Sequence, residues 1–361
     1  MAEHLDRIRN LLDCKKLDAI LIRSKAMKRW MRTMTGSGCS VVVSRDDGWM
    51  LVDGRYINEA RACEHDLAVS LLATQTGTAI YSAVGRLAAE KGWQTLGIED
   101  SATHASQYLM LKEEVPHVSV LGDEIAELRI RKTPEEIDKL QHAVDITDAI
   151  FSGVVTKMHA GMTDYEISAL LQYEGIAHGA EKMSFDTIVA IGGHTADPHG
   201  RPRGDALHAG EHVMIDFGLQ VDGYQSDMTR IVFCGTPNDS ILDLYKIVRA
   251  AQQAGIDEMG EGVSSEDVDA TARSVIEAAG YGGFFNHGLG HGIGVDDETE
   301  LPLLRPGCHY TLHEGMVMSC EPGVYVPGLG GIRIEDDVWL HDGKGVPLNH
   351  TTKDPIVISG E

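Results

Sequence analysis

The stretch VMIDFGLQVDGYQSDMTRIVF (residues 213–233) reads as two antiparallel β-strands joined by the dipeptide Asp222-Gly223. This dipeptide favours a two-residue type I′ turn, and the turn fixes the register of the hairpin. In that register Asp216 and Asp227 are diagonal neighbours on one face, so their carboxylates lie close enough to share an ion. The hairpin therefore presents two acidic side chains together.

A second stretch, VMSCEPGVYVPGLGGIRIEDDV (residues 317–338), repeats this arrangement. A loop at residues 327–329 brings Glu321 directly opposite Glu335 on one face of a hairpin. Like charges at this separation repel each other and cost stability unless a cation lies between them. Any one of the four acids alone would be read as a solvated strand residue, but the two hairpins together predict a metal site.

A third segment, NHGLGHGIGVDDE (residues 286–298), supplies nitrogen. Its glycines leave the backbone room to approach another element closely, and His291 is the candidate metal ligand. His287 would join it at i, i+4 spacing only on a helix, which this density of glycine disfavours. No capped helix follows the glycines, so a phosphate-binding loop is a weak interpretation.

The composition limits the class of protein. The chain has 361 residues, 43% of them hydrophobic, and a net charge of −24, which argues against nucleic acid and anionic membranes as partners. It has no apolar run long enough to span a bilayer and no signal-peptide pattern at the N-terminus. Six cysteines without a CxxC pair favour reduced thiols, so we expect a soluble cytoplasmic protein.

Two domains are expected, over residues 1–125 and 126–361. The first alternates helical and strand patterns, which is typical of a small α/β domain. Its expected elements are a helix over residues 3–16 and strands over 17–22, 40–44 and 49–52, the last two joined at the turn dipeptide Asp47-Gly48.

The second domain opens on a strong helix start. Thr133 is the expected N-cap, Pro134 occupies the first helical position, and Glu136 closes a capping box. The helix should bury a single stripe of apolar residues along one side. That stripe consists of Ile137, Leu140, Ala143, Val144 and Ala149.

The second domain also repeats itself. GMTDYEISAL from residue 161 aligns with GVSSEDVDAT from residue 262, at an offset of 101 residues, and each is a glycine followed by a capped helix start. The approach to Asp216 likewise matches the approach to Glu321, at an offset of 105. These spacings indicate a duplicated helix-then-hairpin unit, whose approximate two-fold axis would bring both acidic hairpins to one site for two metal ions.

Taken as a set, the motifs resemble those of the pita-bread metallopeptidases, specifically the Xaa-Pro aminopeptidase and prolidase branch. They are DFG with SDMTR (216–230), GLGHGIG (288–294), CEPGVY (320–325), RIEDD (333–337), VDGRY (52–56) and LRIRKTPEEI (128–137). The resemblance implies an α+β fold. A small creatinase-like α/β N-terminal domain would precede a pseudo-two-fold pita-bread catalytic domain.

Five metal ligands follow from the resemblance. Asp227 and Glu335 would bridge two divalent ions, and Asp216 would bind the first ion alone. His291 and Glu321 would complete the shell of the second ion. Such an oxygen-rich set suits manganese, with cobalt, iron or zinc able to replace it.

The resemblance also implies catalytic roles outside the metal shell. Glu321 would take a proton from water and pass it to the leaving nitrogen, while His199 and His287 match histidines that bond substrate or the developing oxyanion. Arg333 shares a strand face with Glu335 and would hold a bridging carboxylate or a water, unless it forms an ordinary hairpin salt bridge. The remaining histidines are expected to be solvated, among them His208, His212, His309 and His313.

The implied function is a metal-dependent exopeptidase, working as a homodimer. It would hydrolyse Xaa-Pro bonds of dipeptides or short peptides through a hydroxide activated by two metal ions, as a dipeptidase or an aminopeptidase. Glu298 stands where the branch usually carries a substrate-contacting histidine, which motivates an alternative: a pita-bread hydrolase of another small amide or amidine. A non-catalytic binding protein on the same fold is less favoured, because all five ligand positions are filled.

Overall fold

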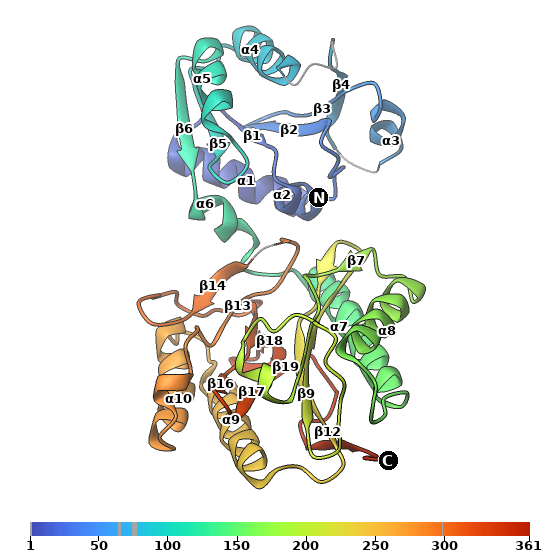
Figure 1. Cartoon of the computed structure of the whole chain (residues 1–361). Coiled ribbons are helices and arrows are strands. Elements are labelled where there is room, and N and C mark those ends of the chain that lie inside the picture. The colour runs from blue at the N-terminus through green and yellow to red at the C-terminus, as the bar shows by residue number, and fades with distance from the viewer. Residues whose placement is uncertain (1, 64–65, 74–77, 298) are drawn as a thin grey trace. The chain divides into compact units, whose positions relative to one another are not determined.

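The computed structural model describes residues 2–63, 66–73, 78–297 and 299–361 (Figure 1). The chain divides into two compact units, Met1–Arg129 and Ile130–Glu361. Both mix helices and strands, in agreement with the expected α+β class. Glu298, which the sequence singles out, lies outside the described residues.

The N-terminal unit is built on a six-stranded mixed sheet with the strand order β4-β3-β2-β1-β5-β6. Its strands are β1 (Ala19–Ile22), β2 (Cys39–Ser44), β3 (Gly48–Val52), β4 (Ala68–Leu71), β5 (Thr95–Glu99) and β6 (His117–Leu121). Its helices are α1 (Ala2–Lys15), α2 (Lys25–Trp30), α3 (Ile57–Ala62), α4 (Ala79–Lys91), α5 (Ala105–Glu114) and α6 (Asp123–Ala126). Strands β1 and β2 are buried along their whole length, which explains their unbroken apolar sequences. The predicted first helix and three strands are confirmed within two residues.

The turn between β2 and β3 differs from the prediction. Gly48 pairs with Val43, so the chain reverses at residues 45–46 and not at the Asp-Gly dipeptide. The hydroxyl of Ser44 accepts the N–H of Asp47 at 3.0 Å. This side-chain bond closes the turn locally, and a serine turn of this kind competes with the type I′ geometry that the dipeptide favours.

Within its described residues, the C-terminal unit contains four long helices and a series of short strands (Figure 1). The helices are α7 (Pro134–Val155), α8 (Asp164–Ala177), α9 (Asp239–Glu258) and α10 (Ser265–Ala278). The strands of its first half are β7 (Lys182–Met183), β8 (Ile188–Ile191), β9 (His212–Phe217), β10 (Leu219–Val221), β11 (Tyr224–Gln225) and β12 (Met228–Cys234). Those that follow are β13 (Gly290–Gly292), β14 (Glu300–Leu304), β15 (Val317–Cys320), β16 (Gly323–Val326), β17 (Gly330–Arg333), β18 (Asp336–His341), β19 (Lys344–Pro347) and β20 (Ile356–Ile358).

Helix α7 begins as predicted. The hydroxyl of Thr133 accepts the N–H of Glu136, and the Glu136 carboxylate accepts the N–H of Thr133 at 2.8 Å. The predicted buried stripe is wrong at its last position, because Ala149 is exposed. It lies five residues after the buried Val144, a rotation of about 140° around the helix axis.

Two matching halves make up the C-terminal unit. The four-stranded sheet runs β20-β12-β9-β8, and the five-stranded sheet runs β14-β13-β15-β18-β19, so β9 and β15 occupy corresponding inner positions. Gly161 and Gly262 both adopt positive φ, of 88° and 83°. Their N–H groups donate to the carbonyls of Leu207 and Leu312, at 2.7 and 2.8 Å. The predicted duplication is confirmed by these equivalent contacts at the two helix starts.

Both acidic hairpins form in the predicted register. Asp216 pairs with Thr229 across β9 and β12, and the turn residues Asp222 and Gly223 have φ of 49° and 80°, as a type I′ turn requires. In the second hairpin Val326 pairs with Gly330. Cys320 pairs with Asp336 further along, so Glu321 and Glu335 face each other.

Neither hairpin is a single continuous ladder, however. Strands β9 and β12 belong to one sheet and β10 and β11 to another, and the second hairpin is divided in the same way into β15–β18 and β16–β17. Asp227, Glu321 and Glu335 lie at these breaks, just outside the named strands. The acids therefore sit where the ladder opens and carboxylates from both hairpins have room to converge.

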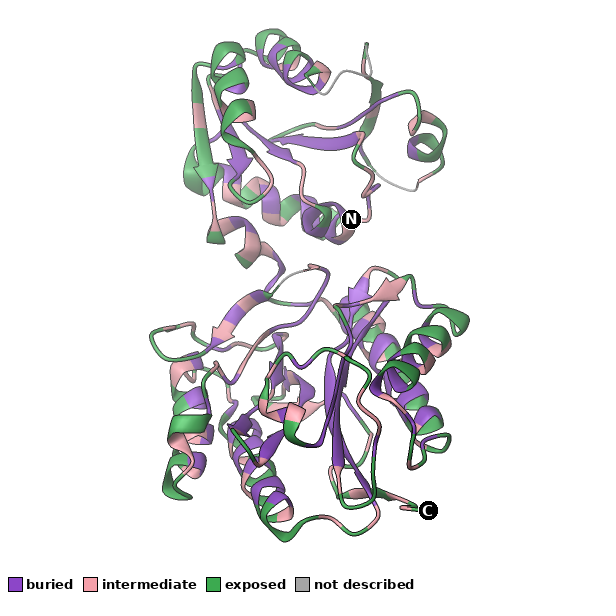
Figure 2. Ribbon diagram, viewed as in Figure 1, coloured by how far each residue is buried: buried purple, intermediate pink, exposed green. Residues whose placement is uncertain are grey.

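The inner strands of the C-terminal unit are almost wholly buried, while its helices present one buried and one exposed side (Figure 2). Met214 and Met318 are fully buried among apolar side chains, as the sequence predicted. All six cysteines are unpaired, which agrees with the expected free thiols. No described helix combines the length and the apolarity that a bilayer crossing needs.

His212 corrects the expectation that it is solvated. It is 3% exposed, and its Nε2 lies 3.0 Å from the hydroxyl of Thr195 and 3.1 Å from the carbonyl of Gly331. Burial lowers the pKa of His212 to about 4. Its polar sequence neighbours suggested a surface position, but its side chain turns inward from the start of β9.

Candidate metal centre

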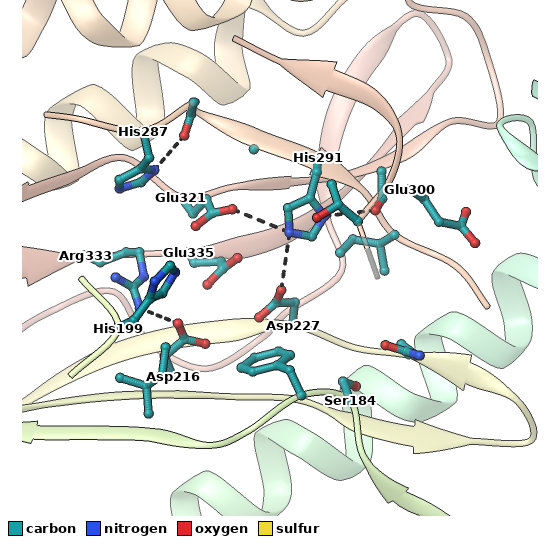
Figure 3. A pocket seen from close by; sticks show the side chains of 18 of the residues that line it. Ser184, His199, Asp216, Asp227, His287, His291, Glu300, Glu321, Arg333 and Glu335 are labelled. Atoms are coloured by element: carbon teal, nitrogen blue, oxygen red, sulfur yellow. Dashed lines mark hydrogen bonds and ion pairs between the residues drawn. The ribbon is translucent and has the colours of Figure 1, made fainter. Parts of the chain in front are cut away.

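Three carboxylates from the two hairpins meet at one point. Asp216, Asp227 and Glu335 are 6%, 8% and 1% exposed, and each offers an oxygen within 4.8 Å of the others (Figure 3). Asp216 Oδ1, Asp227 Oδ1 and Glu335 Oε1 are buried without a hydrogen-bond partner among the described residues. Buried, unpartnered oxygens of like charge require a compensating cation.

The electrostatics of this cluster support the same conclusion. Burial, followed by the charges of Glu335 and Asp216, raises the pKa of Asp227 well above its usual range. Burial and the neighbouring charge of Glu321 do the same to the pKa of Glu335. A divalent cation would favour the ionised forms of these groups and remove the penalty. The donor set therefore fits the metal ions that the sequence predicted.

His291 faces the carboxylates from strand β13. Its Nε2 lies 3.6 Å from Glu321 Oε1 and 3.8 Å from Asp227 Oδ2 (Figure 3). Its Nδ1 lies 3.0 Å from the carbonyl of Gly292, which assigns the proton to Nδ1 and leaves the Nε2 lone pair directed at the acids. This arrangement is the one that metal-binding histidines use.

The glycines around His291 permit the close approach that the sequence predicted. A Cβ on Gly290 would lie 2.1 Å from the carbonyl oxygen of Ser319, and one on Gly292 would lie 2.0 Å from that of Leu301. The hydroxyl of Ser319 donates to Glu321 at 3.2 Å, which orients this carboxylate toward the histidine.

Arg333 is buried and forms an ion pair with Asp216, not with a bridging carboxylate. Its Nε donates to the hydroxyl of Thr229 at 3.1 Å, and that hydroxyl donates to Glu335 at 2.6 Å. Thr229 therefore links the arginine to Glu335. Asp216 is paired directly, so the four acids of the two hairpins do not have equivalent surroundings.

His287 belongs to a chain of hydrogen bonds behind the acids. Its Nδ1 lies 2.7 Å from the carbonyl of Gly288, and its Nε2 lies 2.9 Å from the hydroxyl of Tyr325. Arg333 donates to the same hydroxyl at 2.7 Å. Burial, followed by the charge of Arg333, lowers the pKa of His287 to about 4, so the ring is neutral and accepts the Tyr325 hydroxyl. Both ring nitrogens are engaged within the protein.

His199 is exposed, and its side chain makes no hydrogen bond to the described residues. It lies beside Arg333 in Figure 3. The loop that carries it is held by Arg333, whose Nη1 donates to the carbonyl of Pro198 at 3.1 Å. Its ring is therefore available to a bound molecule.

All of the site residues predicted from the sequence line one cavity of about 940 Å³. They are Asp216, Asp227, His291, Glu321, Glu335, His199, His287 and Arg333. Elements from both halves contribute, so the pseudo-two-fold arrangement brings together segments more than 100 residues apart.

Sequence reasoning missed several supporting residues. Asp337 is fully buried and accepts the backbone N–H of Asp227 at 2.9 Å, which fixes the position of that aspartate. Thr229 and Tyr325 connect the arginine to its surroundings. Thr229 could have been found, since the predicted register placed it opposite Asp216. Asp337 lies on the second hairpin and holds Asp227 of the first, and Tyr325 bonds His287 of a separate segment. No local sequence pattern reveals contacts of this kind.

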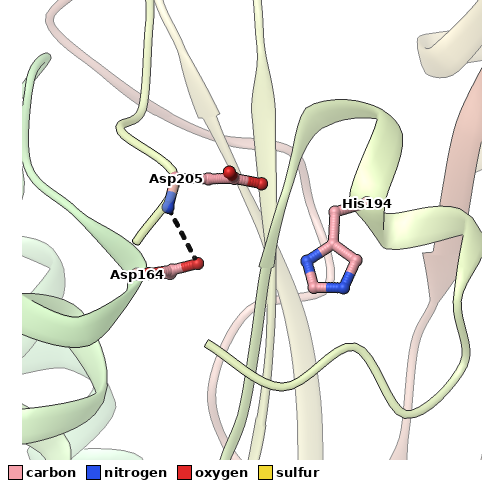
Figure 4. Close-up of side chains that lie close together, drawn as sticks. All are labelled: Asp164, His194 and Asp205. Atoms are coloured by element: carbon pink, nitrogen blue, oxygen red, sulfur yellow. Dashed lines mark hydrogen bonds between the residues drawn. The ribbon is translucent and has the colours of Figure 1, made fainter. Parts of the chain in front are cut away.

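A second group that could hold a cation lies apart from this cavity, at Asp164, His194 and Asp205 (Figure 4). The Asp164 carboxylate accepts three consecutive backbone N–H groups, of residues 203–205. Asp205 forms an ion pair with Arg203 at 2.7 Å. Protein donors thus already compensate these two carboxylates, in contrast to those of the main cluster.

Two parts of the sequence match known families. Residues 138–342 match the metallopeptidase family M24, and residues 4–131 match the Creatinase/Prolidase N-terminal domain. The chain belongs to metallopeptidase family M24. Membership of this family confirms the predicted resemblance and implies divalent metal ions as cofactors and peptides as substrates.

Relatives within the family cover nearly the whole chain. The Xaa-Pro dipeptidase of Pyrococcus furiosus is 31% identical over 98% of this chain and 99% of its own. The structure of an Xaa-Pro dipeptidase from Bacillus anthracis is 32% identical, covers 99% of both chains and gives a TM-score of 0.93. That of an X-Pro aminopeptidase from Thermotoga maritima is 31% identical, covers 95% of this chain and 98% of its own, and gives a TM-score of 0.87.

Proposed function

We propose that this M24 protein is an exopeptidase that hydrolyses Xaa-Pro bonds of dipeptides or short peptides. The observation that carries the proposal is the cavity in which the four carboxylates of the two hairpins meet His291, three of these acids having buried oxygens without a partner among the described residues. The relatives named Xaa-Pro dipeptidase and X-Pro aminopeptidase support the proline specificity.

The metal ligands are proposed to be Asp216, Asp227, His291, Glu321 and Glu335, holding two divalent ions. Oxygen ligands with one imidazole favour manganese, with cobalt, iron or zinc as substitutes. When bound, the ions would supply Lewis-acid polarisation of the scissile carbonyl and would make a water molecule more acidic.

Glu321 is the proposed proton carrier. Without metal, burial raises the pKa of Glu321, while the charge of Arg333 and the hydrogen bond from Ser319 act in the opposite direction. A bound cation would favour the ionised form of Glu321, which can take a proton from water and return it to the leaving nitrogen. This return matters for proline, because the tertiary amide carries no N–H and its nitrogen must be protonated before it departs.

The remaining site residues are proposed to orient substrate. His199, with its ring free of the described residues, would donate a hydrogen bond to the substrate carbonyl as negative charge develops on it. His287 and Arg333 would act through Tyr325 and Asp216, because their bonds within the protein already engage them. They hold the hairpins in place for the reaction.

A defined peptide panel tests the function. Enzyme stripped by chelation and reloaded with Mn²⁺ should cleave Xaa-Pro dipeptides or Xaa-Pro-Yaa peptides, but not the matched Xaa-Ala peptides. Cleavage of dipeptides alone would identify a dipeptidase, and cleavage of longer peptides an aminopeptidase. Activity confined to other amides or amidines, with every proline peptide intact, would refute the proposal. Light scattering on the same sample would test the proposed homodimer.

A further inference from the structure

One side of the cavity is formed by the segment that follows His291, residues 293–297, which we call the wall segment. It lies against the first hairpin. The N–H of Gln225 donates to the carbonyl of Gly294 at 2.8 Å, and the Gln225 side chain donates to Asp297 at 3.2 Å. The ammonium of Lys182 lies 2.6 Å from the same Asp297 carboxylate. The wall segment therefore joins the two halves across the edge of the cavity.

Glu300 holds the wall segment from the inner side. Its Oε1 accepts the N–H groups of Val295 and Asp296, at 2.9 and 3.0 Å. The residue is 4% exposed. A Cβ on Gly294 would lie 2.4 Å from Glu300 Oε2, so the backbone passes as close to this carboxylate as it can. These contacts determine the path of the chain immediately after the predicted metal ligand.

A buried lysine balances the charge of Glu300. The ammonium of Lys132 lies 3.4 Å from Glu300 Oε2, and its side chain is 2% exposed. The backbone N–H of Lys132 donates to the carbonyl of Gly315 at 2.7 Å, just before strand β15. That strand leads to Glu321. The ion pair thus fastens the wall segment to the strand that ends at the proposed proton carrier.

Ionised Glu300 suits this position better than a neutral side chain does. Hydrogen bonds from backbone N–H groups to a carboxylate are roughly twice as strong as those to a neutral acceptor. The Lys132 ammonium compensates the charge of the Glu300 carboxylate in the interior, and loss of either partner would leave the other charge uncompensated. Glu300 consequently holds the wall segment more firmly than the segment's own backbone hydrogen bonds alone would hold it.

We propose that Glu300, together with Lys132, is a positioning residue that fixes the wall segment and so sets the fit of the substrate beside the metal ligands. This inference rests on the proposed peptidase function. Glu300 acts through the wall segment, so its loss should weaken substrate binding while leaving the predicted ligands in place.

Kinetics of three variants test the proposal. Glu300→Ala should raise KM for the best Xaa-Pro peptide roughly tenfold or more, the effect of about 1.4 kcal/mol of lost binding, with kcat changed much less. Manganese content should equal that of the wild type. Glu300→Gln should be defective as well, since it places a neutral amide against Lys132. Combining it with Lys132→Met keeps the acceptor for Val295 and Asp296 and should restore KM to within about threefold of wild type.

Asp164→Ala is the matched control. Asp164 is another buried carboxylate that accepts consecutive backbone N–H groups, but the segment that it holds, residues 203–205, does not line the cavity. This variant should lower Tm and leave KM unchanged. If Glu300→Ala behaved in the same way, Glu300 would be merely structural and the proposal would be overturned.

Amide hydrogen exchange provides a readout that does not need activity. Exchange at Val295 and Asp296 should become faster in Glu300→Ala and remain slow in Asp164→Ala. Unchanged exchange at both amides would overturn the proposal. A wild-type enzyme that cleaves no proline peptide would refute the peptidase function instead, and the exchange measurement would still decide whether Glu300 fixes the wall segment.

Discussion

At the scale of single residues, the site is governed by which carboxylates have partners inside the protein. Asp216 is paired with Arg333, and Glu335 accepts a hydrogen bond from Thr229. Asp227 Oδ1 has no hydrogen-bond partner among the described residues, and Asp227 Oδ2 lies 3.8 Å from Nε2 of His291. The pKa of Asp227 is raised well above its usual range by burial and by the surrounding acids. Asp227 is therefore the residue whose charge depends most on a cation.

This difference leads to a prediction for Asp227→Asn. The variant should lose activity by more than about a hundredfold and bind less manganese, because a proposed bridging ligand is lost. Its chelated form should have a higher Tm than chelated wild type, because a buried repulsive charge is removed. Calorimetry and metal analysis would measure both effects. A variant that stays active, or whose chelated form is less stable, would contradict the assignment.

His199 should behave differently, because it lies outside the metal ligands. In His199→Ala we expect kcat to fall by about a hundredfold, the usual effect of removing one donor to a developing oxyanion. Metal content and Tm should match the wild type, since the exposed ring makes no hydrogen bond to the described residues. Full activity in this variant would leave the proposed substrate contact without support.

At the scale of elements, the sequence predicted correctly those features that a turn or a helix cap determines locally. The Asp222-Gly223 turn fixed the positions of two acids, Asp216 and Asp227, and the capping box at Thr133 located a helix start correctly. The same reasoning was wrong at Asp47-Gly48, where the hydroxyl of Ser44 closes a different turn. Neither the partner of Arg333 nor the burial of His212 could be predicted, because both depend on contacts between elements that the sequence separates widely.

His212 supports a prediction about acid stability at this scale. It joins the start of β9 to β17 through the carbonyl of Gly331. Its pKa is lowered to about 4 in the folded protein, against 6.5 for the unperturbed group, so the unfolded state binds the proton more readily. Stability from this residue is complete above pH 6.5 and is lost as the pH falls towards 4. The loss is on the order of 3 kcal/mol.

Urea unfolding at pH 7 and at pH 4.5 would measure this effect. His212→Gln keeps a side-chain N–H for Gly331 but has no proton to gain, so it should lose less stability between the two pH values than the wild type does. The comparison of variants separates His212 from His287, whose pKa is also lowered to about 4 and which is present in both proteins. Equal losses in the two proteins would show that His212 does not titrate as argued.

At the scale of the whole molecule, duplication explains why a charged centre can lie at the middle of the C-terminal unit. Each half contributes one hairpin, and the paired acids of each hairpin repel each other, which costs stability when no cation lies between them. The halves are joined through Arg333 and Asp216, and through Thr229 and Glu335. Bound cations would add to these links, so metal binding and the folding of the unit should be thermodynamically connected.

Metal removal should therefore lower Tm, and by an amount that depends on pH. Without metal, Asp227, Glu321 and Glu335 have raised pKa values, because burial disfavours their charged forms. The folded state then holds protons that the unfolded state releases, so the contribution of these acids to the stability of the chelated protein falls as the pH rises above about 4. Manganese removes this penalty by favouring the ionised carboxylates, and at a thousand times its Kd it adds about 4 kcal/mol. The difference in Tm between loaded and chelated protein should grow from pH 5 to pH 8 and shrink in Asp227→Asn. A difference that is absent, or the same at every pH, would show that these acids do not enclose a cation site.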